Sequence, residues 1–527
     1  MFRYRVHTFR RVLLTGVSLL LHGVNSFPQD SRGYDQPYRP QYHFSPQKNW
    51  TNDPNGPVYF EGEYHLFFQY NPFGDIWGHM SWGHAVSPDL VHWKELPVAL
   101  TEENGVMIFT GSTVVDRQNS SGFCEGGKPC LVAIYTGHTP APAPTAKALQ
   151  TQNLAFSNDK GRTWTKYSGN PVLNLNMPDF RDPDVFWSEA GKRWIMAVSL
   201  PDDHKIRFYG SANLKAWEHL SDFGPAGAVS GQWECPNLVE LPVDGDARKK
   251  RWVLKVGLNP GGVQGGSGEQ YFVGQFDGTR FLNENSGSLA LWSDWGKDCY
   301  CALAFNDLPR TEKPVMVGWM SNWQYAAKLP TSPWRGQMTI PREITLRTLP
   351  EGIRLVQTPA KAVVALGEKH QTWTKGSAGE VNKAIAQDPI RSHSFRLTAN
   401  FETASSKQVG IKLLEKGGTY TLIGFDSGRN ELYVDRSHSG RTTFSKDFPA
   451  RVAAPLHLGS PKLRLDVLAD RSSIEVFADA GHVVLTNLVF PDDDAYGLET
   501  FSSDGSGTIE LESWTLRSVW SGSSAAR

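Results

Sequence analysis

Short hydrophobic runs of the kind found in β-strands recur along most of the chain, whereas helical periodicity is scarce. Clear examples are Tyr64–Phe68, Trp194–Val198, Trp252–Val256 and Pro314–Trp319, and the 50 glycines and 33 prolines of the chain separate such runs. Because glycine and proline favour turns and interrupt regular structure, this pattern predicts an all-β protein.

A weak internal repeat is visible in the first two thirds of the chain. In three places a strand-like run ends in a Ser-x-Asp or Ser-x-Asn turn, and a tryptophan opens the next run: Ser87 to Trp93, Ser157 to Trp164 and Ser211 to Trp217. Hairpin units repeated at intervals of roughly 50–70 residues suit the blades of a β-propeller. Chance recurrence of hairpin turns is the alternative interpretation, and the propeller is the favoured one.

The composition changes after about residue 360. Tryptophan becomes sparse, residues 361–390 are weakly patterned, and short alternating strands such as Ser394–Phe401 and Ser473–Phe477 follow. Such strands predict a β-sandwich. We therefore expect a propeller over residues 27–360, a linker over 361–390 and a sandwich over 391–527, and a length of 527 residues also favours two domains.

The first 26 residues are typical of a secretory signal peptide. Four arginines between Arg3 and Arg11 precede a short hydrophobic run, Val12–Leu21, and Val24–Ser26 offers a cleavage site before Phe27. The hydrophobic run is too short to span a bilayer. We expect a secreted protein with no membrane partner.

Charge and composition limit the kinds of partner and ligand that we expect. The chain has 53 basic and 54 acidic side chains and a formal net charge of -1, which gives no support for nucleic acid or an anionic membrane as a partner. The 18 tryptophans are many for a soluble protein. Most should pack in the core, and a few could stack on the C–H faces of sugars.

The five cysteines predict one disulfide. Cys124 and Cys130 flank a turn-rich segment and could close a small loop. Cys299 and Cys301 would lie on the same face of a strand, which is poor geometry for a bond between them, so we expect both to be buried free thiols, and Cys235 as well. Because no CxxC or HExxH pattern occurs, we expect no metal site.

Two sequons for N-glycosylation occur, at Asn49 and Asn119. Asn119 lies in a polar segment and is a plausible glycan site. Asn49 lies four residues before Asp53, where a glycan would crowd the candidate site described next, so we expect it to be bare or poorly occupied.

Three acidic residues lie in similar local settings. Asp53 is in Trp-Thr-Asn-Asp-Pro-Asn-Gly, Asp182 in Phe-Arg-Asp-Pro, and Glu234 in Trp-Glu-Cys-Pro, each with an aromatic residue and a proline nearby. An ionised carboxylate in rigid, apolar surroundings is costly unless it is paired or used. Two carboxylates that face a sugar are the catalytic groups of most glycoside hydrolases.

The neighbours of these acids suggest different tasks. A tight turn at Asp53 would hold its charge with backbone N–H groups, which suits a nucleophile. Apolar groups such as Trp233 around Glu234 would raise its pKa, which suits a general acid. Arg181 beside Asp182 would lower its pKa, so that it stays ionised and stabilises charge. Taken alone, the Asp53 motif could be only a turn, the Glu234 motif only a core residue and the Asp182 motif only an ion pair. Their joint occurrence points to catalysis.

Together, these motifs resemble those of glycoside hydrolase family 32, whose members include invertases, exo-inulinases and levanases. The resemblance extends over His43–Gly56, Phe67–Pro72, Trp77–Ala85 and Trp319–Tyr325, and Asp470–Phe477 resembles the marker of the family's C-terminal sandwich. It implies a five-bladed propeller that carries the site, followed by a β-sandwich that either braces the propeller or binds sugar; we expect bracing. It implies no metal and no organic cofactor.

The resemblance also implies a retaining mechanism on β-fructofuranosides. Asp53 would attack the anomeric C2 of fructose, Glu234 would act as general acid and then base, and Asp182 would hold fructose hydroxyls. Retention requires the carboxyls of Asp53 and Glu234 to lie about 5 Å apart. The positions that match the family's fructose pocket are Asn52, Gln69, Trp77, Ser112, Arg181, Asp298 and Trp323.

The sequence departs from the family pattern in two places. Thr51 stands where the family usually has an apolar residue, and Cys299 and Cys301 replace commoner apolar residues after Asp298. Asp53 itself favours exo action, and the segments around Trp82 and Trp323 resemble fungal exo-inulinases most.

The leading hypothesis is therefore a secreted exo-acting fructosidase that releases terminal fructose from sucrose, inulin and levan. A fructosyltransferase, in which an acceptor sugar replaces water, would use the same three carboxylates and stays an alternative. A sugar-binding protein that has lost catalysis is less favoured, because all three carboxylates are present.

Overall fold

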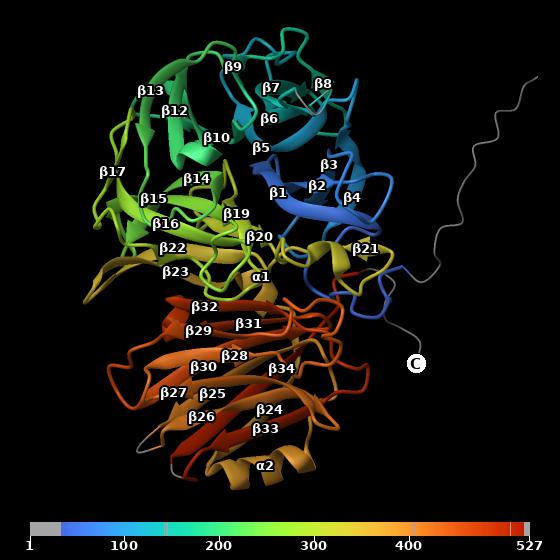
Figure 1. The fold of residues 1–527 in the computed structure, drawn as a ribbon, viewed down its shortest axis with the longest axis vertical. Helices are drawn as coiled ribbons and strands as arrows, with labels where there is room; N and C mark the ends of the chain where they lie inside the picture. The colour runs from blue at the N-terminus through green and yellow to red at the C-terminus, as the bar shows by residue number, and fades with distance from the viewer. Residues whose placement is uncertain (1–32, 142, 144–145, 404–405, 506, 521–527) are drawn as a thin grey trace, which may run out of the picture.

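The computed structural model describes residues 33–520 apart from 142, 144–145, 404–405 and 506, and the predicted signal peptide, residues 1–26, lies outside the described residues. The regular secondary structure of the described residues is almost entirely β-strand, as the sequence predicts, in a larger N-terminal and a smaller C-terminal domain (Figure 1). Within this part of the chain, no helix combines the length and the hydrophobicity needed to cross a membrane.

The N-terminal domain is a β-propeller of five antiparallel blades around a central axis (Figure 1). The strands of the five blades, in order, are β1 (Asn49–Phe60), β2 (Glu63–Tyr70), β3 (Ser81–Ser87) and β4 (Lys94–Leu100); β5 (Met107–Asp116), β6 (Cys130–Thr139), β7 (Leu149–Ser157) and β8 (Thr165–Lys166), with β9 (Leu173–Met177) also on β7; β10 (Arg181–Ser188), β11 (Arg193–Leu200), β12 (Lys205–Ser211) and β13 (Glu218–Phe223); β14 (Gln232–Val243), β15 (Asp246–Asn259), β16 (Gly268–Phe276) and β17 (Phe281–Asn283), with β18 (Leu291–Trp292) on β16; and β19 (Tyr300–Ala304), β20 (Val315–Trp319), β22 (Arg342–Leu349) and β23 (Gly352–Pro359).

The first strand of each blade lies nearest the axis. Consecutive inner strands β1, β5, β10, β14 and β19 contact one another, and β19 returns to β1, which closes the ring. The short strand β21 (Trp334–Arg335) adds to β1 in parallel, so the last blade is also tied to the first. The predicted acids lie near the starts of β1, β10 and β14, so ring closure brings them to the same end of the axis.

The blades explain the continuous hydrophobic runs of the sequence. In β11, Met196 and Val198 pack into the core shared with the second blade, whereas Ile195 and Ala197 pack into the core shared with the fourth. Side chains alternate between the two faces of a strand, and both faces of a blade are covered by neighbouring blades. Both sets of positions must therefore be apolar.

The C-terminal domain is a β-sandwich, as predicted. Its core lies between a six-stranded sheet in the order β24-β34-β25-β30-β31-β32 and a five-stranded sheet in the order β29-β28-β27-β26-β33. The strands are β24 (Gly367–Gly376), β25 (Phe395–Glu402), β26 (Gln408–Lys416), β27 (Thr419–Asp426), β28 (Glu431–Asp435), β29 (Arg451–Pro455), β30 (Lys462–Asp470), β31 (Ser473–Ala478), β32 (Val483–Leu488), β33 (Gly497–Ser502) and β34 (Thr508–Leu516).

The prediction of a linker over residues 361–390 is wrong. After the short helix α1 (Lys361–Val364), β24 joins the six-stranded sheet, and α2 (Ala378–Gln387) packs Val381 and Ile385 into the sandwich core. β24 is an edge strand with only Gln371 and Trp373 buried. Because one face and one edge of the strand are polar, its hydrophobic pattern is weak in the sequence.

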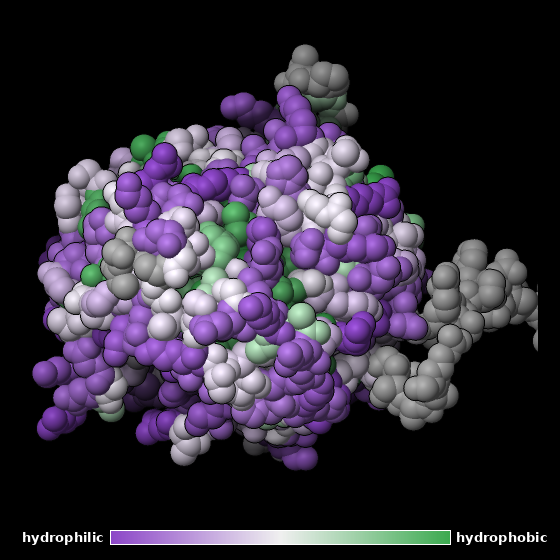
Figure 2. All heavy atoms as spheres, turned by 90° about the horizontal axis from the view of Figure 1, so that it is seen from below, coloured by the Kyte–Doolittle hydropathy of each residue, from purple (hydrophilic) through white to green (hydrophobic). Residues whose placement is uncertain are grey.

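A buried interface joins the two domains. Apolar residues from both sides share one cluster, which includes Phe44, Phe68 and Val317 of the propeller and Phe477, Val484 and Leu516 of the sandwich. Viewed from the sandwich end, by contrast, the surface is mostly hydrophilic, with hydrophobic atoms in small patches (Figure 2). This arrangement fits a sandwich that braces the propeller.

Buried charges cross the same interface. The ring of His43 lies 2.9 Å from an oxygen of Asp470 and 2.8 Å from one of Glu475, and Arg342 also pairs with Glu475. Asp470 and Glu475 both belong to the predicted marker of the sandwich, whereas His43 and Arg342 come from the propeller. The marker residues therefore hold the domains together.

Candidate active site

A pocket of about 370 Å³ opens where the inner strands of the propeller begin, and it contains all three predicted carboxylates. The motifs of Asp53, Asp182 and Glu234 come from three different blades. The lining residues are Asn52, Asp53, Gln69, Trp77, Phe109, Thr110, His138, Gln150, Asp179, Arg181, Asp182, Glu234, Asn259 and Trp323.

Asp53 lies within a strand rather than in the tight turn that the sequence predicts. Its motif is part of β1, whose pairing with β2 has a register shift at Asp53, between Thr51 and Pro54, and a second one between Asn55 and Val58. Gly56 lies within the second shift with φ +45, and a Cβ there would lie 2.2 Å from the hydroxyl of Thr113. Only glycine fits this combination of positive φ and close approach.

The carboxylate of Asp53 is buried and has one hydroxyl donor. Thr110 Oγ1 donates to Asp53 Oδ2 at 2.8 Å, and the aspartate is 8% exposed. Burial, and next the negative charge of Glu234, raise the pKa of Asp53 to about 6. Asp53 therefore holds its proton more tightly than an ordinary aspartate, although Thr110 favours the charged form.

Asp182 is held by the backbone of the fourth blade. Its Oδ2 accepts a hydrogen bond from Cys235 N at 2.9 Å, and its own N–H donates to Thr136 Oγ1 at 3.0 Å. We expected Arg181 to keep the pKa of Asp182 low. Instead, burial outweighs the charge of Arg181 and raises the pKa of Asp182 to about 7.

Glu234 is surrounded by polar groups rather than by the apolar ones that the sequence suggests. Arg181 Nε donates to Glu234 Oε1 at 3.0 Å, and the hydroxyl of Tyr300 donates to Oε2. Trp233, the expected apolar neighbour, packs instead into the core between the third and fourth blades. Adjacent residues on a strand point to opposite faces, so Trp233 cannot cover the carboxylate of Glu234.

Tyr300 reaches Glu234 because a glycine makes room for it. Gly257 of β15 pairs with Glu234 of β14, and a Cβ on Gly257 would lie 3.0 Å from the ring of Tyr300. We did not identify Tyr300 from the sequence. Its only signal there is its position between Cys299 and Cys301.

Arg181 is the cation that the acids of the pocket share. Besides Glu234, its guanidinium contacts Asp179 at 2.6 Å and Gln232 at 2.8 Å. With Asp53 and Asp182, the lining of the pocket thus contains four carboxylates and one guanidinium. Burial and the negative charge of Glu234 favour the protonated forms of Asp53 and Asp182, which suits a site that must both donate and accept protons.

Five of the seven predicted substrate-binding residues line the pocket, and two do not. The five are Asn52, Gln69, Trp77, Arg181 and Trp323. Ser112 instead accepts a hydrogen bond from Val185 N at 2.9 Å, between the second and third blades. Asp298 is fully buried at the domain interface, where it pairs with Arg436 and accepts from the hydroxyl of Tyr325 at 2.5 Å. Both have structural partners, and neither lines this pocket.

Several lining residues were not predicted. Thr110 lies two positions before the predicted Ser112, and Asp179 lies two positions before Arg181. Both lining residues are therefore close in sequence to predicted residues but were not among them. No motif marks the others, which reach the pocket only because their strands end there: Phe109, His138, Gln150 and Asn259.

The cysteines agree with the prediction in part. Cys124 and Cys130 form a disulfide, with a Cα–Cα distance of 5.1 Å, and Cys299 is a buried free thiol. Cys235 and Cys301, predicted to be free, instead form a second disulfide with a Cα–Cα distance of 5.3 Å. They are 66 positions apart and meet because the fourth and fifth blades are neighbours around the axis.

Acceptor atoms of Asp53, Cys235 and Cys301 lie within 4.8 Å of one another, the spacing that a metal site would need. The two sulfurs are bonded to each other, however, and a metal binds the thiolate form of cysteine. The donor set therefore does not fit a metal.

The two glycosylation sites stay predictions. Asn119 is exposed in a loop, where its amide contacts the backbone of Cys124. Asn49 is partly buried and donates to Pro72 O at 2.8 Å. The second arrangement leaves less room for a glycan than the first.

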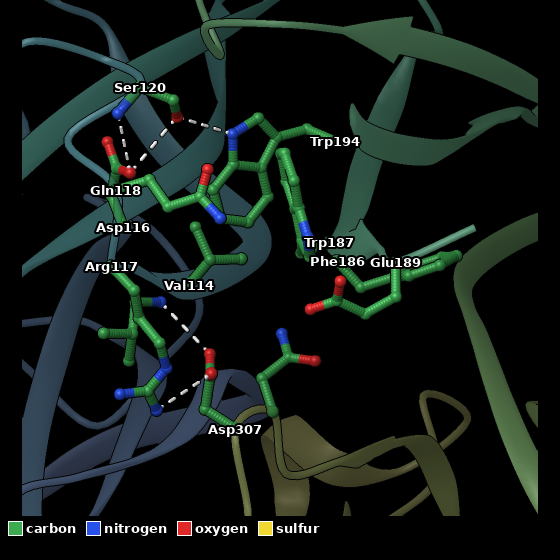
Figure 3. Close-up of a pocket in the computed structure, with 12 residues that line it drawn as sticks. Val114, Asp116, Arg117, Gln118, Ser120, Phe186, Trp187, Glu189, Trp194 and Asp307 are labelled. Carbon is green, nitrogen blue, oxygen red and sulfur yellow. Dashed lines mark hydrogen bonds and ion pairs between the residues drawn. The ribbon is translucent and has the colours of Figure 1, made fainter. Parts of the chain in front are cut away.

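A second cavity, of about 270 Å³, lies at the opposite ends of β5 and β10 and is drawn in Figure 3. Its charged groups are paired with one another or with neighbours: Arg117 contacts Asp307 at 3.2 Å, and Asp116 accepts from Ser120. The cavity contains none of the three predicted acids.

The comparison with protein families agrees with this site. Residues 43–359 match the glycosyl hydrolases family 32 N-terminal domain, and residues 362–518 match the glycosyl hydrolases family 32 C-terminal domain. The chain therefore belongs to glycosyl hydrolase family 32, and it is a glycosidase.

The chain is also similar to individual members of this family over most of its length. The chain is 45% identical over 519 residues to a levanase of Bacillus subtilis, a match that covers 97% of this chain and 75% of the relative. It is 42% identical over 520 residues to an extracellular exo-inulinase of Aspergillus niger, covering 92% and 96%. The crystal structure of an exo-inulinase from Aspergillus awamori aligns with a TM-score of 0.84 at 40% identity, covering 92% of this chain and all of the other.

Proposed function

We propose that this glycosidase is a secreted, exo-acting β-fructofuranosidase that releases terminal fructose from sucrose, inulin and levan with retention of configuration. The observation that carries the proposal is the convergence of Asp53, Asp182 and Glu234 in one pocket of a family 32 propeller. The relatives named levanase and exo-inulinase support fructans as substrates.

The contacts in the pocket support a separate catalytic role for each of the three acids. Asp53, oriented by Thr110, is the nucleophile that attacks the anomeric carbon of fructose. Glu234 protonates the leaving oxygen and later deprotonates the attacking water, and Arg181 and Tyr300 hold its two oxygens in place for both steps. Asp182 is fixed by Cys235 N, so that its carboxylate can bind fructose hydroxyls.

Two observations support secretion. One of the fungal relatives is named as an extracellular enzyme. The chain also contains two disulfides, and such bonds persist mainly in oxidising compartments outside the cytosol. The sequence of residues 1–26 agrees with this location.

Product analysis tests the proposal. The purified protein should release fructose as the sole monosaccharide from inulin, and glucose with fructose from sucrose, whereas the Asp53→Ala variant should release neither. Proton NMR of the first-formed fructose should show the β-anomer. Transfer products as the main outcome with concentrated sucrose would change the assignment to a fructosyltransferase, and absence of turnover would refute the assignment as an enzyme of fructans.

A further inference from the structure

The Cys235–Cys301 disulfide lies directly beneath the three carboxylates of the pocket. Cys235 follows Glu234 in β14, and Cys301 follows Tyr300 in β19. β14 and β19 are the inner strands of the fourth and fifth blades, and they do not pair with each other, because β22 and β20 lie between them in the sheet. The disulfide is therefore a direct covalent link between two strands that the hydrogen-bond ladder joins only indirectly.

The backbone on both sides of this link is irregular. The β14–β15 pairing has a register shift between Glu234 and Asn237, and the β19–β20 pairing has one between Tyr300 and Leu303. Both cysteines have left-handed backbone angles, with φ 47 and φ 49. Glu234 and Tyr300 are the last paired residues before these shifts, so the ladder holds them on one side only and the disulfide of the next residues adds a constraint on the other.

Each carboxylate of the site contacts one of these two segments. Cys235 N donates to Asp182, and Tyr300 donates to Glu234. Cys235 Sγ lies 3.7 Å from Asp53 Oδ2. A shift of β14 relative to β19 would thus move all three acids relative to one another.

We propose that the Cys235–Cys301 disulfide is a positioning element of the active site, which clamps the strand of Glu234 to the strand of Tyr300. This inference rests on the proposed function. Cys235 and Cys301 are both buried, with exposed fractions of 1% and 0%. The clamp is thus shielded from solvent reductants in the folded protein and acts as a permanent part of the site.

The disulfide also limits the donors available to Asp53. A disulfide sulfur carries no hydrogen, so Cys235 Sγ contacts Asp53 Oδ2 without donating to it, and Thr110 is the hydroxyl donor of that oxygen. Breaking the bond at Cys301 would leave a thiol at Cys235 that can donate to Asp53. The charged groups facing Asp53, which are Asp182 and Glu234, would be unchanged.

The test combines two variants with two controls. In Cys301→Ala, kcat on sucrose should fall roughly 10- to 100-fold with KM within about threefold, because a small misplacement of catalytic groups has an effect of this size. The acidic limb of the pH–rate profile should also move to lower pH, because the new thiol stabilises ionised Asp53. In the double variant Cys235→Ala/Cys301→Ala, kcat should fall similarly but the acidic limb should stay in place.

Two matched controls distinguish an effect on the position of the catalytic groups from a general loss of stability. The Cys124→Ser/Cys130→Ser variant removes the other disulfide, and Cys299→Ala removes a buried thiol two residues from Cys301. Both should keep the kcat and the pH profile of the wild type. Thermal unfolding of every variant shows whether a loss of kcat reflects loss of the fold.

Alkylation of the denatured wild type without reductant supplies a test that needs no variant. One cysteine, Cys299, should react; reaction at three would show that Cys235 and Cys301 are free and would overturn the proposal. Wild-type kcat and pH profile in folded Cys301→Ala would overturn it as well. If the wild type itself releases no fructose, the proposed function fails rather than the positioning role.

Discussion

Two clusters of charged side chains, one in the active-site pocket and one at the domain interface, differ in how their charges are balanced. The active-site cluster consists of Asp53, Asp179, Asp182, Glu234 and Arg181. The interface cluster consists of His43, Arg342, Asp294, Asp470 and Glu475. The first has four carboxylates and one cation, and the second has three carboxylates and two cations.

The pKa values follow this balance. In the active-site cluster, burial raises the pKa of Asp53 to about 6 and that of Asp182 to about 7. In the interface cluster, burial would also raise the values, but His43 and Arg342 outweigh it and hold the pKa of Asp470 and Glu475 below their ordinary values. At Asp294 of the same cluster, burial outweighs Arg342 and raises the pKa, so burial and partners together set the pKa of each acid.

The largest effect should come from neutralising the nucleophile. Asp53→Asn should lower kcat/KM on sucrose by about 10⁴-fold or more, because the amide cannot attack the anomeric carbon. Yet the free energy of unfolding of the variant at pH 7 should be higher than that of the wild type by roughly 1–3 kcal/mol. Asp53 has a raised pKa, so it stabilises the fold when protonated and loses that stabilisation as pH rises through about 6. The neutral amide of the variant does not have this loss. Urea unfolding at pH 7 measures this, and a less stable variant would contradict the comparison.

Removing a carboxylate from the interface cluster should have the opposite effect. Glu475→Gln should lower the free energy of unfolding by about 3–5 kcal/mol, because Arg342 and His43 lose a buried partner. Sucrose KM of the folded fraction should be unchanged. The double variant Arg342→Met/Glu475→Met should be less destabilised than the sum of the single variants.

A surface pair provides the control for this experiment. Lys192 and Glu189 pair at 2.7 Å but are 73% and 70% exposed, so Lys192→Ala should hardly change the unfolding midpoint. Equal losses for Lys192→Ala and Glu475→Gln would mean that burial of the interface cluster does not matter.

The third prediction concerns pH. Burial alone would lower the pKa of His43, but hydrogen bonds to Asp470 and Glu475 raise it to about 9. Its stabilising effect is therefore complete below the unfolded pKa of about 6.5 and is lost as pH rises through about 9. The wild type should lose about 2–3 kcal/mol of stability over this range. In His43→Gln that dependence should be absent, as thermal unfolding between pH 6 and pH 10 can show.

The smallest effect is expected at the rim of the active-site pocket. Trp77 lines the pocket and is 44% exposed. Trp77→Ala should raise KM for inulin about three- to tenfold, the loss of one stacking contact, with little change in kcat or stability. An equal fall in kcat would place Trp77 in the catalytic step instead.

The candidate site was largely predictable because its motifs are local. Asp53, Asp182 and Glu234, with five of the seven predicted binding residues, line one pocket. The surroundings of the acids were less predictable. Arg181 was expected beside Asp182 but also holds Glu234, and Tyr300 was missed because its partner lies 66 positions away.

The sequence by itself determined the strands, the two domains and the three acidic motifs, because alternation, turn residues and short motifs act over a few positions. Only the tertiary structure decided that Cys235 bonds to Cys301, that Asp298 and Ser112 have structural partners, and that Asp182 has a raised pKa. Each of these depends on which strands meet around the propeller axis or at the domain interface. Burial and electrostatic partners arise from such long-range contacts, which neighbouring residues in the sequence do not specify.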